Sequence, residues 1–310
     1  MWEDKTYMPL YLGIDAGGTK TDCAISNGAA LLGQAAGESC KVTQIGEQPA
    51  KRALQDTILR ACNAARVSSQ EIQQVCIGIS GASIKSTVAW AEAVIGELTP
   101  GKVRVVGDHV IAHRAAFGDC PGVLVIAGTG SIAYGRNERG ESARAGGWGP
   151  VASDQGSAFW IGREAVAAAL RTHDLGSNNG MLSMIQELWQ TSSPEEVIHI
   201  ANSGAISKFS ELAAPVAKAA EQGDAGAQAI TERAGEELAA LAGAVIARLW
   251  PRAGVVRVAL AGGVLQGSAL VRRAFQHALQ AEYTETAISF AYVRPVLGAL
   301  AIAAARETPQ

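Results

Sequence analysis

The spacing of apolar residues along the chain predicts an alternation of strands and helices. Residues 11–14 form a short apolar run, and residues 20–26 alternate in polarity with the period of a strand. From Leu54 to Ala65, apolar residues recur at helical spacing. The first part of the chain is therefore predicted to follow the order β-β-β-α-β-α-β-α, with strands at residues 11–14, 20–26, 30–36, 75–79 and 103–106.

The same pattern begins again at residue 122. An apolar strand at 122–127 runs into the turn 128–131, and a second strand follows at 132–135. Two copies of one motif arise by coincidence less often than a single copy, so the sequence predicts two duplicated units, each with a hairpin turn that faces a ligand. The second half continues with an alanine-rich helical region at 201–250 and an apolar strand that runs into Gly262-Gly263.

Several turns carry local expectations. Gly17-Gly18 supplies a turn that tolerates positive φ. Residues 39–46 are expected to form a polar loop, and residues 145–150 are too glycine-rich for regular structure. Asp154 or Ser153 is expected to be the N-cap of the helix that follows.

Composition and charge narrow the class of protein. A length of 310 residues is long for a single core, so we expect two domains. The formal net charge of −3 gives no electrostatic basis for binding nucleic acid or an anionic membrane. The five cysteines are scattered and form no C-x-x-C pair, which argues against a disulfide framework or a zinc site. The polar N-terminus lacks an apolar signal core, and we expect a cytoplasmic protein with reduced thiols.

The first hairpin carries chemistry as well as a turn. Asp15, Gly17, Gly18, Thr19 and Thr21 place a carboxylate, two glycines and two hydroxyls within seven positions. Glycines let backbone N–H groups approach an anion, hydroxyls donate to phosphate oxygens, and a carboxylate can hold Mg²⁺ through water. A hairpin with a polar turn is the simpler alternative, but the full string favours phosphate binding.

Four glycine-bearing turns each follow an apolar strand, at residues 17–18, 80–81, 128–130 and 262–263. Ligands of open α/β sheets bind beyond the carboxyl ends of the strands, so this arrangement favours a bound nucleotide. The chain has no G-x-x-x-x-G-K-[ST] motif, and no G-x-G-x-x-G follows the first strand. A P-loop protein and dinucleotide binding are therefore disfavoured.

Five motifs together resemble a known family: Asp15-x-Gly17-Gly18-Thr19-x-Thr21, Ala127-Gly128-Thr129-Gly130-Ser131, Gly146-Gly147-Trp148-Gly149, Ser153-Asp154-Gln155-Gly156-Ser157 and Leu260-Ala261-Gly262-Gly263. The chain resembles the BadF/BadG/BcrA/BcrD-type ATPases, and among them it is most similar to N-acetylglucosamine kinases. The resemblance implies the actin, Hsp70 and sugar-kinase fold. This is an α/β protein with two ribonuclease H-like lobes and a nucleotide cleft between them. The lobes would be residues 1–112 with a C-terminal helix at about 295–310, and residues 113–294.

The resemblance also implies a ligand for each turn. The first phosphate motif would comprise Gly17, Gly18, Thr19 and Thr21, with Asp15 near Mg²⁺ and bound to it through water. The second, which would grip the β- and γ-phosphates of ATP, would comprise Gly128, Thr129, Gly130 and Ser131. Gly262 and Gly263 would form the adenosine motif, and a plain strand-to-helix turn is an equal alternative for them.

Two carboxylates are candidates for the sugar site. Asp108 ends a strand and starts a helix, where an N-cap role is common. The resemblance instead implies the base that contacts the attacking sugar hydroxyl, and the two roles are compatible. Asp154 would bind sugar hydroxyls, again with an N-cap as the alternative. The resemblance adds to this site Ser80, Gly81, Gly147 and Trp148. For Trp148 the alternatives are a lid anchor or plain packing.

The function that the resemblance implies is ATP-dependent phosphorylation of N-acetylglucosamine to N-acetylglucosamine 6-phosphate, with Mg²⁺ as cofactor. Residues 39–44 lack the asparagine that holds the sugar in the resembling kinases, so glucosamine or another amino sugar stays open. One alternative is an ATPase that activates a CoA reductase or dehydratase. Such ATPases share an iron–sulfur cluster across a dimer, and Cys120 is the candidate ligand for it. A sugar-responsive repressor would need a DNA-binding domain before the first strand. We expect a homodimer, although no surface in the sequence identifies its interface.

Overall fold

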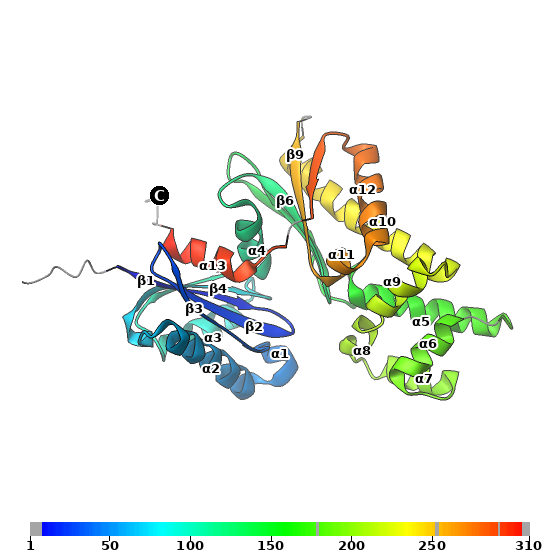
Figure 1. The fold of residues 1–310 in the computed structure, drawn as a ribbon, viewed down its shortest axis with the longest axis horizontal. Coiled ribbons are helices and arrows are strands. Elements are labelled where there is room, and N and C mark those ends of the chain that lie inside the picture. The colour runs from blue at the N-terminus through cyan, green and yellow to red at the C-terminus, as the bar shows by residue number, and fades with distance from the viewer. Residues whose placement is uncertain (1–7, 178–179, 252–253, 291, 306–310) are drawn as a thin grey trace, which may run out of the picture. The chain divides into compact units, whose positions relative to one another are not determined.

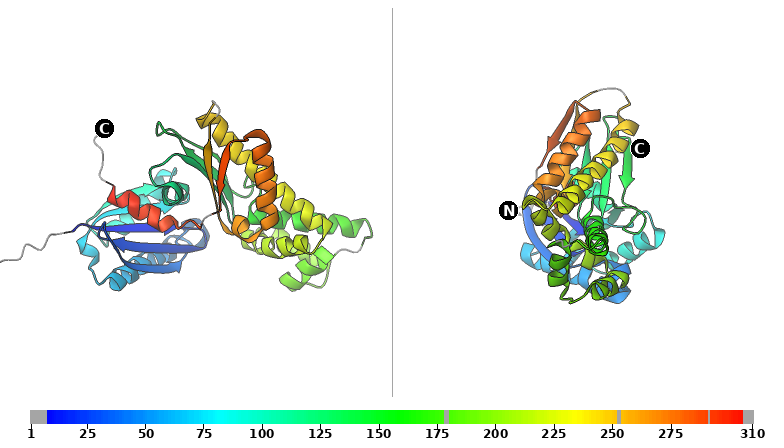
Figure 2. Two further views of the ribbon diagram at one scale, coloured as in Figure 1. Left: turned by 45° about the horizontal axis from the view of Figure 1, so that its top comes forward. Right: turned by 90° about the vertical axis from the view of Figure 1, so that its right-hand side faces the viewer.

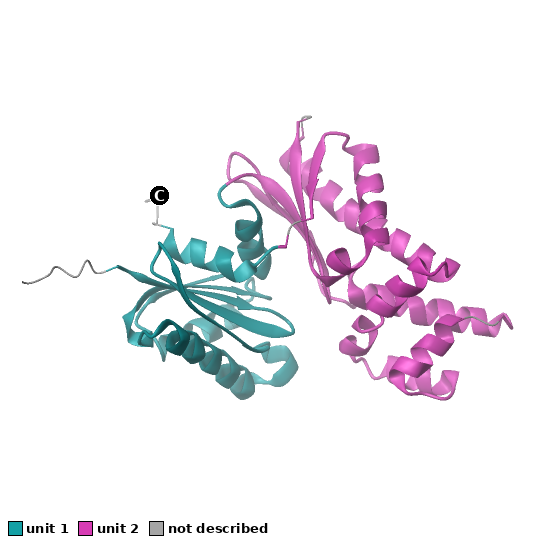
Figure 3. Cartoon of the chain, viewed as in Figure 1, with its two compact units in different colours: residues 1–119, 293–310 teal, residues 120–292 magenta. Residues whose placement is uncertain are grey.

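The chain forms two compact units (Figure 3). The structure, a computed structural model, describes residues 8–177, 180–251, 254–290 and 292–305. Unit 1 consists of Met1–Asp119 and Val293–Gln310, and unit 2 of Cys120–Tyr292. Each unit holds one five-stranded sheet. Residue 112, where the sequence places the end of the first lobe, lies inside α4 (Asp108–Phe117), and unit 1 continues past the end of that helix.

Unit 1 is built on a mixed sheet with the strand order β3-β2-β1-β4-β5. Its strands are β1 (Leu10–Ala16), β2 (Lys20–Ser26), β3 (Leu31–Glu38), β4 (Ile72–Ile79) and β5 (Lys102–Val106). The first three pair antiparallel, and β4 and β5 run parallel to β1. Its other helices are α1 (Val42–Ile45), α2 (Glu47–Ala65), α3 (Lys85–Gly96) and α13 (Pro295–Ala304), with a 3-10 turn at Ser69–Glu71. The predicted order of elements is confirmed, apart from α1 and the 3-10 turn.

Helices cover both faces of the unit 1 sheet (Figure 1). Helices α2 and α3 pack on one face, against Leu12 and Ile14 of β1, whereas α4 and α13 pack on the other. Gly13 belongs to this second face, and a Cβ there would lie 2.6 Å from the backbone nitrogen of Leu300. Because successive residues of a strand point to opposite faces, Asp15 falls on the same face as Gly13.

Unit 2 repeats this sheet topology. Its strands are β6 (Gly122–Ala127), β7 (Ser131–Arg136), β8 (Ser142–Gly146), β9 (Val256–Ala261) and β10 (Thr286–Ser289). Strands β6, β7 and β8 pair antiparallel, β9 runs parallel to β6, and β10 runs parallel to β9. Read from β8, the order β8-β7-β6-β9-β10 matches the order in unit 1. The predicted duplication is thus confirmed at the level of topology.

The helices of unit 2 form one large core with the sheet. They are α5 (Ala158–Asp174), α6 (Gly180–Trp189), α7 (Pro194–Asn202), α8 (Ile206–Ser210), α9 (Ala213–Glu221), α10 (Ala225–Leu249), α11 (Gly263–Gly267) and α12 (Ala269–Glu282). Helices α10 and α12 lie side by side (Figure 2), because Gly235 brings its backbone close to the carbonyl of Val271. The apolar side chains of α10 from Ile230 to Leu249 lie in this core. In the described part of the chain, no helix combines the length and apolar character that crossing a bilayer requires.

Some local expectations were wrong. The expected loop at 39–46 contains α1, whose Val42 packs on the core. The glycine-rich stretch at 145–150 starts inside β8, because β8 pairs with β7 through backbone groups. The N-cap of α5 is Ser157, which accepts from the N–H of Trp160, and not Asp154 or Ser153.

Candidate active site

Three carboxylates gather at one edge of the unit 1 sheet. Asp15 lies at the carboxyl end of β1, and the antiparallel register places Asp22 of β2 directly opposite. Lys20 forms an ion pair with Asp22 at 2.7 Å. Asp108 follows β5 at the same edge, and its charge acts on Asp15. The edge therefore combines an excess of negative charge with the Gly17–Thr19 turn.

This crowding changes the acidity of Asp15. Burial, followed by the charges of Asp22 and Asp108, raises the pKa of Asp15 to about 7, and the charge of Lys20 partly opposes the rise. A divalent cation relieves an excess of negative charge of this kind. Carboxylate oxygens, with water and phosphate oxygens, are the ligands that Mg²⁺ prefers, so Asp15 fits this metal. Among the described residues no group of three His, Cys, Asp or Glu side chains could hold a metal, and Mg²⁺ is usually held by one or two carboxylates with water and phosphate.

His109 fixes the carboxylate of Asp108. The N-cap of α4 is Gly107, so Asp108 occupies the first helical position and the N-cap alternative is displaced by one residue. The N–H of His109 donates to Asp108 Oδ1 at 2.8 Å, and His109 Nδ1 lies 3.4 Å from the same oxygen. Burial raises the pKa of Asp108, but the hydrogen bonds from His109 and the charges of His109 and Lys41 outweigh it and hold the pKa below its usual value. With 44% of its side chain exposed, Asp108 is an ionised carboxylate open to a ligand.

The loop after β3 is tied to the first glycine turn. Ser39 Oγ donates to the carbonyl of Gly17 at 3.1 Å. Cys40 is buried in the core beneath α2. Burial raises the pKa of the Cys40 thiol, and the neighbouring Thr21 hydroxyl partly offsets the rise. Thr21 is fully buried on the face opposite to Asp15, so the structure separates it from Thr19 and from the exposed part of the turn.

The second glycine turn is held against the start of α5. The N–H of Ala158 donates to the carbonyl of Gly128 at 2.8 Å, and the N–H of Phe159 donates to that of Thr129 at 3.4 Å. Ser131 is 3% exposed, and its Oγ donates to the carbonyl of Gln155 at 2.7 Å. The Ser131 hydroxyl is therefore bonded within unit 2. A ligand at this turn would have to contact backbone groups instead.

Asp154 lies against this second turn. A Cβ on Gly130 would come within 2.6 Å of Asp154 Oδ2, so glycine at this position leaves room for the carboxylate. Asp154 has a φ of 65° and is 4% exposed. Positive φ is uncommon outside glycine and clusters at functional sites. The structure thus brings Asp154 to the second phosphate motif, where it was not expected to lie.

Gly147 and Trp148 belong to an exposed loop after β8. Gly147 and Gly149 both take positive φ, at 70° and 100°. The Trp148 side chain is exposed, and the guanidinium of Arg144 stacks on its ring at 3.9 Å from the centroid. Arg144 also donates to the carbonyl of Gly146 at 3.1 Å, which fixes the stack. An exposed indole held by a cation is inconsistent with plain core packing and leaves the ligand-facing and lid-anchor interpretations.

Gly262 and Gly263 differ in what surrounds them. Gly262 has a φ of 94°, and a Cβ there would collide with the carbonyl of Ala127 at the end of β6. Gly263 is the first residue of α11. Outside its own chain neighbourhood, the described residues place no atom within 4 Å of where its Cβ would be. The strand-to-helix turn alone explains Gly262, whereas Gly263 leaves open space of the kind that a nucleotide needs.

Ser80 and Gly81 follow β4 at the same edge as Asp15. Gly81 takes a φ of 83°, and Ser80 is exposed. Because β4 lies between β1 and β5, this turn is flanked by those that carry Asp15 and Asp108. Unit 1 therefore brings together its predicted metal, base and sugar residues, whereas Thr21 lies apart from them. Unit 2 brings Asp154 to Gly130, and its Gly147-Trp148 loop is joined to Ser131 by the N–H of Gly147 at 2.8 Å.

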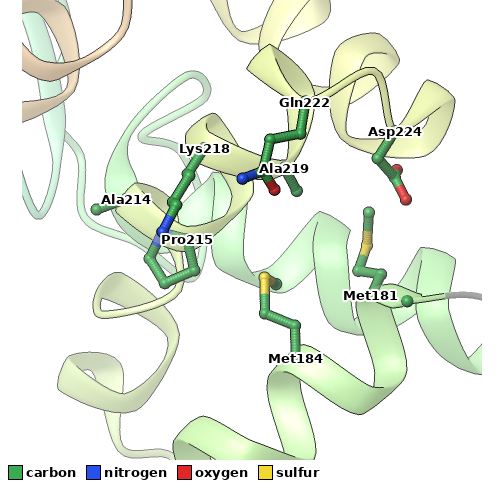
Figure 4. Close-up of a pocket in the computed structure, with 9 residues that line it drawn as sticks. Met181, Met184, Ala214, Pro215, Lys218, Ala219, Gln222 and Asp224 are labelled. Atoms are coloured by element: carbon green, nitrogen blue, oxygen red, sulfur yellow. The ribbon is translucent and has the colours of Figure 1, made fainter.

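A groove of about 610 Å³ lies elsewhere in unit 2 (Figure 4). It runs between α6 and α9, and its lining includes Met181, Met184, Pro215 and Lys218. It contains none of the residues that the sequence assigned to ATP, metal or sugar. The candidate site therefore rests on the glycine turns and their carboxylates and not on the shape of this groove.

Known proteins resemble this chain over nearly its whole length. Residues 12–303 match the model of the BadF/BadG/BcrA/BcrD ATPase family. The N-acetylmuramic acid/N-acetylglucosamine kinase of Clostridium acetobutylicum is 33% identical, over 96% of this chain and 98% of that protein. The N-acetyl-D-glucosamine kinase of Dictyostelium discoideum is 27% identical, over 77% of this chain and 80% of that protein.

A solved structure agrees with the fold. It belongs to a proposed N-acetylglucosamine kinase of Chromobacterium violaceum and matches with a TM-score of 0.76 at 23% identity, over 95% of this chain and 98% of that chain. The expected actin, Hsp70 and sugar-kinase fold is confirmed by this match and by the two equivalent sheets. Taken with the family match over residues 12–303, these observations establish that the chain belongs to the BadF/BadG/BcrA/BcrD ATPase family.

Proposed function

We propose that the protein is an ATP-dependent hexosamine kinase that converts N-acetylglucosamine to N-acetylglucosamine 6-phosphate. The observation that carries the proposal is the 33% identity, over 96% of the chain, to a kinase named for N-acetylmuramic acid and N-acetylglucosamine. The geometry supports it, because an ionised and accessible carboxylate lies at the same sheet edge as a glycine turn. N-acetylmuramic acid is N-acetylglucosamine with a carboxylate-bearing ether, so both sugars are candidate acceptors.

Asp108 is the base in this proposal. A carboxylate within hydrogen-bond reach of the acceptor hydroxyl takes its proton as the oxygen attacks the γ-phosphorus. The hydrogen bond from the N–H of His109 orients this carboxylate. Because the pKa of Asp108 is held below its usual value, the group is deprotonated throughout the neutral range.

The glycine turns bind the phosphates through their backbone. Turns without bulky side chains let N–H groups approach the anion, and the Gly17–Thr19 and Gly128–Ser131 turns have this composition. Gly263 leaves space for the adenosine. The sugar contacts assigned to Ser80, Gly81, Gly147, Trp148 and Asp154 stay predictions, as does a phosphate contact from the buried Thr21.

Asp15 would hold Mg²⁺ through water. When bound, Mg²⁺ neutralises charge on the β- and γ-phosphates. The raised pKa of Asp15, about 7 without a metal, makes the carboxylate sensitive to an arriving cation, because the cation favours its ionised form. The cytoplasmic location and the homodimer stay predictions.

The alternative function as an ATPase activator needs an iron–sulfur cluster shared by two chains. All five cysteines lie in the described ranges, and four of them are buried, which leaves Cys120 exposed. Two copies of the chain would bring two such thiols, whereas a cluster of this type takes four cysteine ligands. The cysteine arrangement therefore favours the kinase.

The test is release of ADP from Mg-ATP in the presence of N-acetylglucosamine, N-acetylmuramic acid, glucosamine, N-acetylmannosamine and glucose, each with a matched reaction that lacks the sugar. We expect strong release with N-acetylglucosamine and little without sugar. Slow release that is indifferent to every sugar would contradict the kinase and direct attention to iron content.

A further inference from the structure

The loop after β3 carries Lys41, and the residues on either side of Lys41 determine where its side chain points. Lys41 has extended backbone, with φ −74° and ψ 101°. It stands between Cys40, which is 1% exposed, and Val42, which packs against the same core beneath α2. Successive side chains of an extended segment point to opposite sides, so the Lys41 side chain points away from that core.

Hydrogen bonds place this cation beside the first glycine turn. Ser39 Oγ accepts from the N–H of Lys41 at 3.2 Å and donates to the carbonyl of Gly17 at 3.1 Å. Lys41 is only partly exposed. The backbone of Lys41 is thus tied to the turn that follows Asp15, and the charge of Lys41 acts on the Asp108 carboxylate.

Lys41 has no carboxylate of its own in the part of the chain that the structure describes. Lys20 is paired with Asp22, and Asp108 contacts His109, but none of the ion pairs within 4 Å includes Lys41. An ammonium group held beside the base without an ion-pair partner is available to an anion on the bound substrate.

We propose that Lys41 is a specificity-determining residue that binds a carboxylate on the acceptor sugar, so that the kinase accepts an acidic amino sugar as well as a neutral one. This inference rests on the proposed function, because it takes Asp108 to be the base at the attacked hydroxyl. A group beside Asp108 lies beside the acceptor. The phosphates of ATP have their own donors in the glycine turns.

An ammonium group at this position would distinguish two acceptor sugars that differ in one substituent. N-acetylmuramic acid carries a carboxylate, ionised at neutral pH, on an ether at the ring, and N-acetylglucosamine carries a hydroxyl there. A hydrogen bond between ammonium and carboxylate is about twice as strong as one between neutral groups. With the neutral sugar, a partly exposed ammonium group stays hydrated at little cost.

The experiment compares kcat and KM for both sugars in the wild type, Lys41→Gln, Lys41→Arg and Lys51→Gln. Assays run at pH 8, where Asp108 is ionised in every variant. We expect Lys41→Gln to raise KM for N-acetylmuramic acid roughly tenfold or more and to leave KM and kcat for N-acetylglucosamine nearly unchanged. Lys41→Arg keeps the charge and should restore most of the affinity. Lys51→Gln removes an equal charge from an exposed ion pair with Glu97 and should not alter the ratio.

Salt gives a second measure of the same contact. In the wild type, KM for N-acetylmuramic acid should rise with ionic strength more steeply than KM for N-acetylglucosamine, and Lys41→Gln should remove this difference. Equal loss of kcat on both sugars would place Lys41 on the transferred phosphoryl group and overturn the proposal. A wild type that phosphorylates only the neutral sugar would overturn it too. A wild type with no sugar-dependent turnover contradicts the proposed function itself, and this inference with it.

Discussion

The two hairpin turns that follow β1 and β6 share a topology and differ in charge. In unit 1 the register pairs Asp15 with Asp22, whereas the corresponding pair in unit 2 is Ile126 with Ile132. One copy of the hairpin therefore carries two facing carboxylates, and the other carries two facing aliphatic side chains. The glycine turn proposed to bind phosphate is common to both copies, whereas the facing carboxylates belong to unit 1.

The hydroxyl residues of the two turns show where the copies agree. The register pairs Thr21 with Ala16 and Ser131 with Ala127, and both hydroxyl residues are buried. They differ in their partners: the Ser131 hydroxyl donates to the carbonyl of Gln155, whereas Thr21 Oγ1 has no hydrogen-bond partner among the described residues. In the proposed function, the backbone N–H groups of the turns are therefore the phosphate ligands that the two copies could share.

Removing the base of unit 1 should have the largest effect. Asp108→Asn is expected to lower the rate of phosphoryl transfer roughly 10²- to 10⁴-fold, because an amide cannot accept the proton. Binding of ATP, measured by calorimetry, should change little, since the nucleotide contacts lie in the turns. Turnover at the wild-type rate would show that Asp108 is not the base and that unit 1 does not supply the acid–base chemistry.

Paired substitutions in unit 2 test its backbone. Gly262→Ala should lower the free energy of unfolding by about 2–4 kcal/mol, because it adds left-handed strain to a collision with the carbonyl of Ala127. Gly263→Ala has room and should keep stability within about 0.5 kcal/mol, while KM for ATP rises. Urea unfolding and ATP kinetics on the same preparations check both. Equal stability of the two variants would contradict this account of Gly262.

The acidic pair of unit 1 should make stability depend on pH. Folding raises the pKa of Asp15 from 3.8 to about 7, so the folded state binds this proton more tightly than the unfolded chain. That contribution is complete below about pH 4 and is lost as the pH rises to 7. Without Mg²⁺, Asp15→Asn should therefore be more stable than the wild type at pH 8, by about 2 kcal/mol after allowance for solvent screening, and equal to it at pH 4.

Unfolding of Asp15→Asn across pH, with Asp56→Asn as the control, measures this effect. Asp56 is exposed and paired with Arg60, so its substitution should not change the pH dependence. The same Asp15 variant should lose Mg²⁺-dependent turnover. A wild type whose stability, relative to Asp15→Asn, does not fall between pH 4 and pH 8 would mean that burial and the charges of Asp22 and Asp108 do not raise the pKa of Asp15 as described.

The smallest effect is expected in the exposed loop of unit 2. Trp148→Ala should leave the free energy of unfolding within about 0.5 kcal/mol of the wild type, because the ring is 71% exposed. If the loop faces the sugar, KM for the sugar rises and sugar-dependent quenching of tryptophan fluorescence is reduced in Trp148→Phe. Unchanged KM and quenching would limit Trp148 to its stack on Arg144.

The sequence predicts those parts of the molecule whose signal is local. Alternating polarity marked β2, helical spacing marked α2 and α10, and the repeated strand, turn and strand marked the duplication. The glycine turns were found for the same reason, because each follows an apolar run. The sequence also allows the prediction that Asp15 and Asp108 lie at one edge of the sheet, since parallel strands end at a common edge.

What the sequence does not predict depends on contacts between distant residues. The face to which Thr21 points is set by its pairing and by the core beneath α2. The charge of Lys41 acts on Asp108 from a loop that is hydrogen-bonded to Gly17, and no spacing along the chain predicts that effect. Ser157 is the N-cap of α5. Several polar residues precede this helix, and tertiary packing decides which of them caps it.

Helix α13 closes unit 1 from the far end of the chain. Glycines at positions 13 and 298 let it lie directly on β1 and α4. On the ribosome, the strands of unit 1 emerge first but lack this helix until residues 295–304 have been made, whereas unit 2 is continuous from Cys120 to Tyr292. The last segment of unit 2 is thus synthesised before the last segment of unit 1. A chain interrupted before residue 295 would leave only α4 on this sheet face and would expose the rest of it to chaperones and proteases.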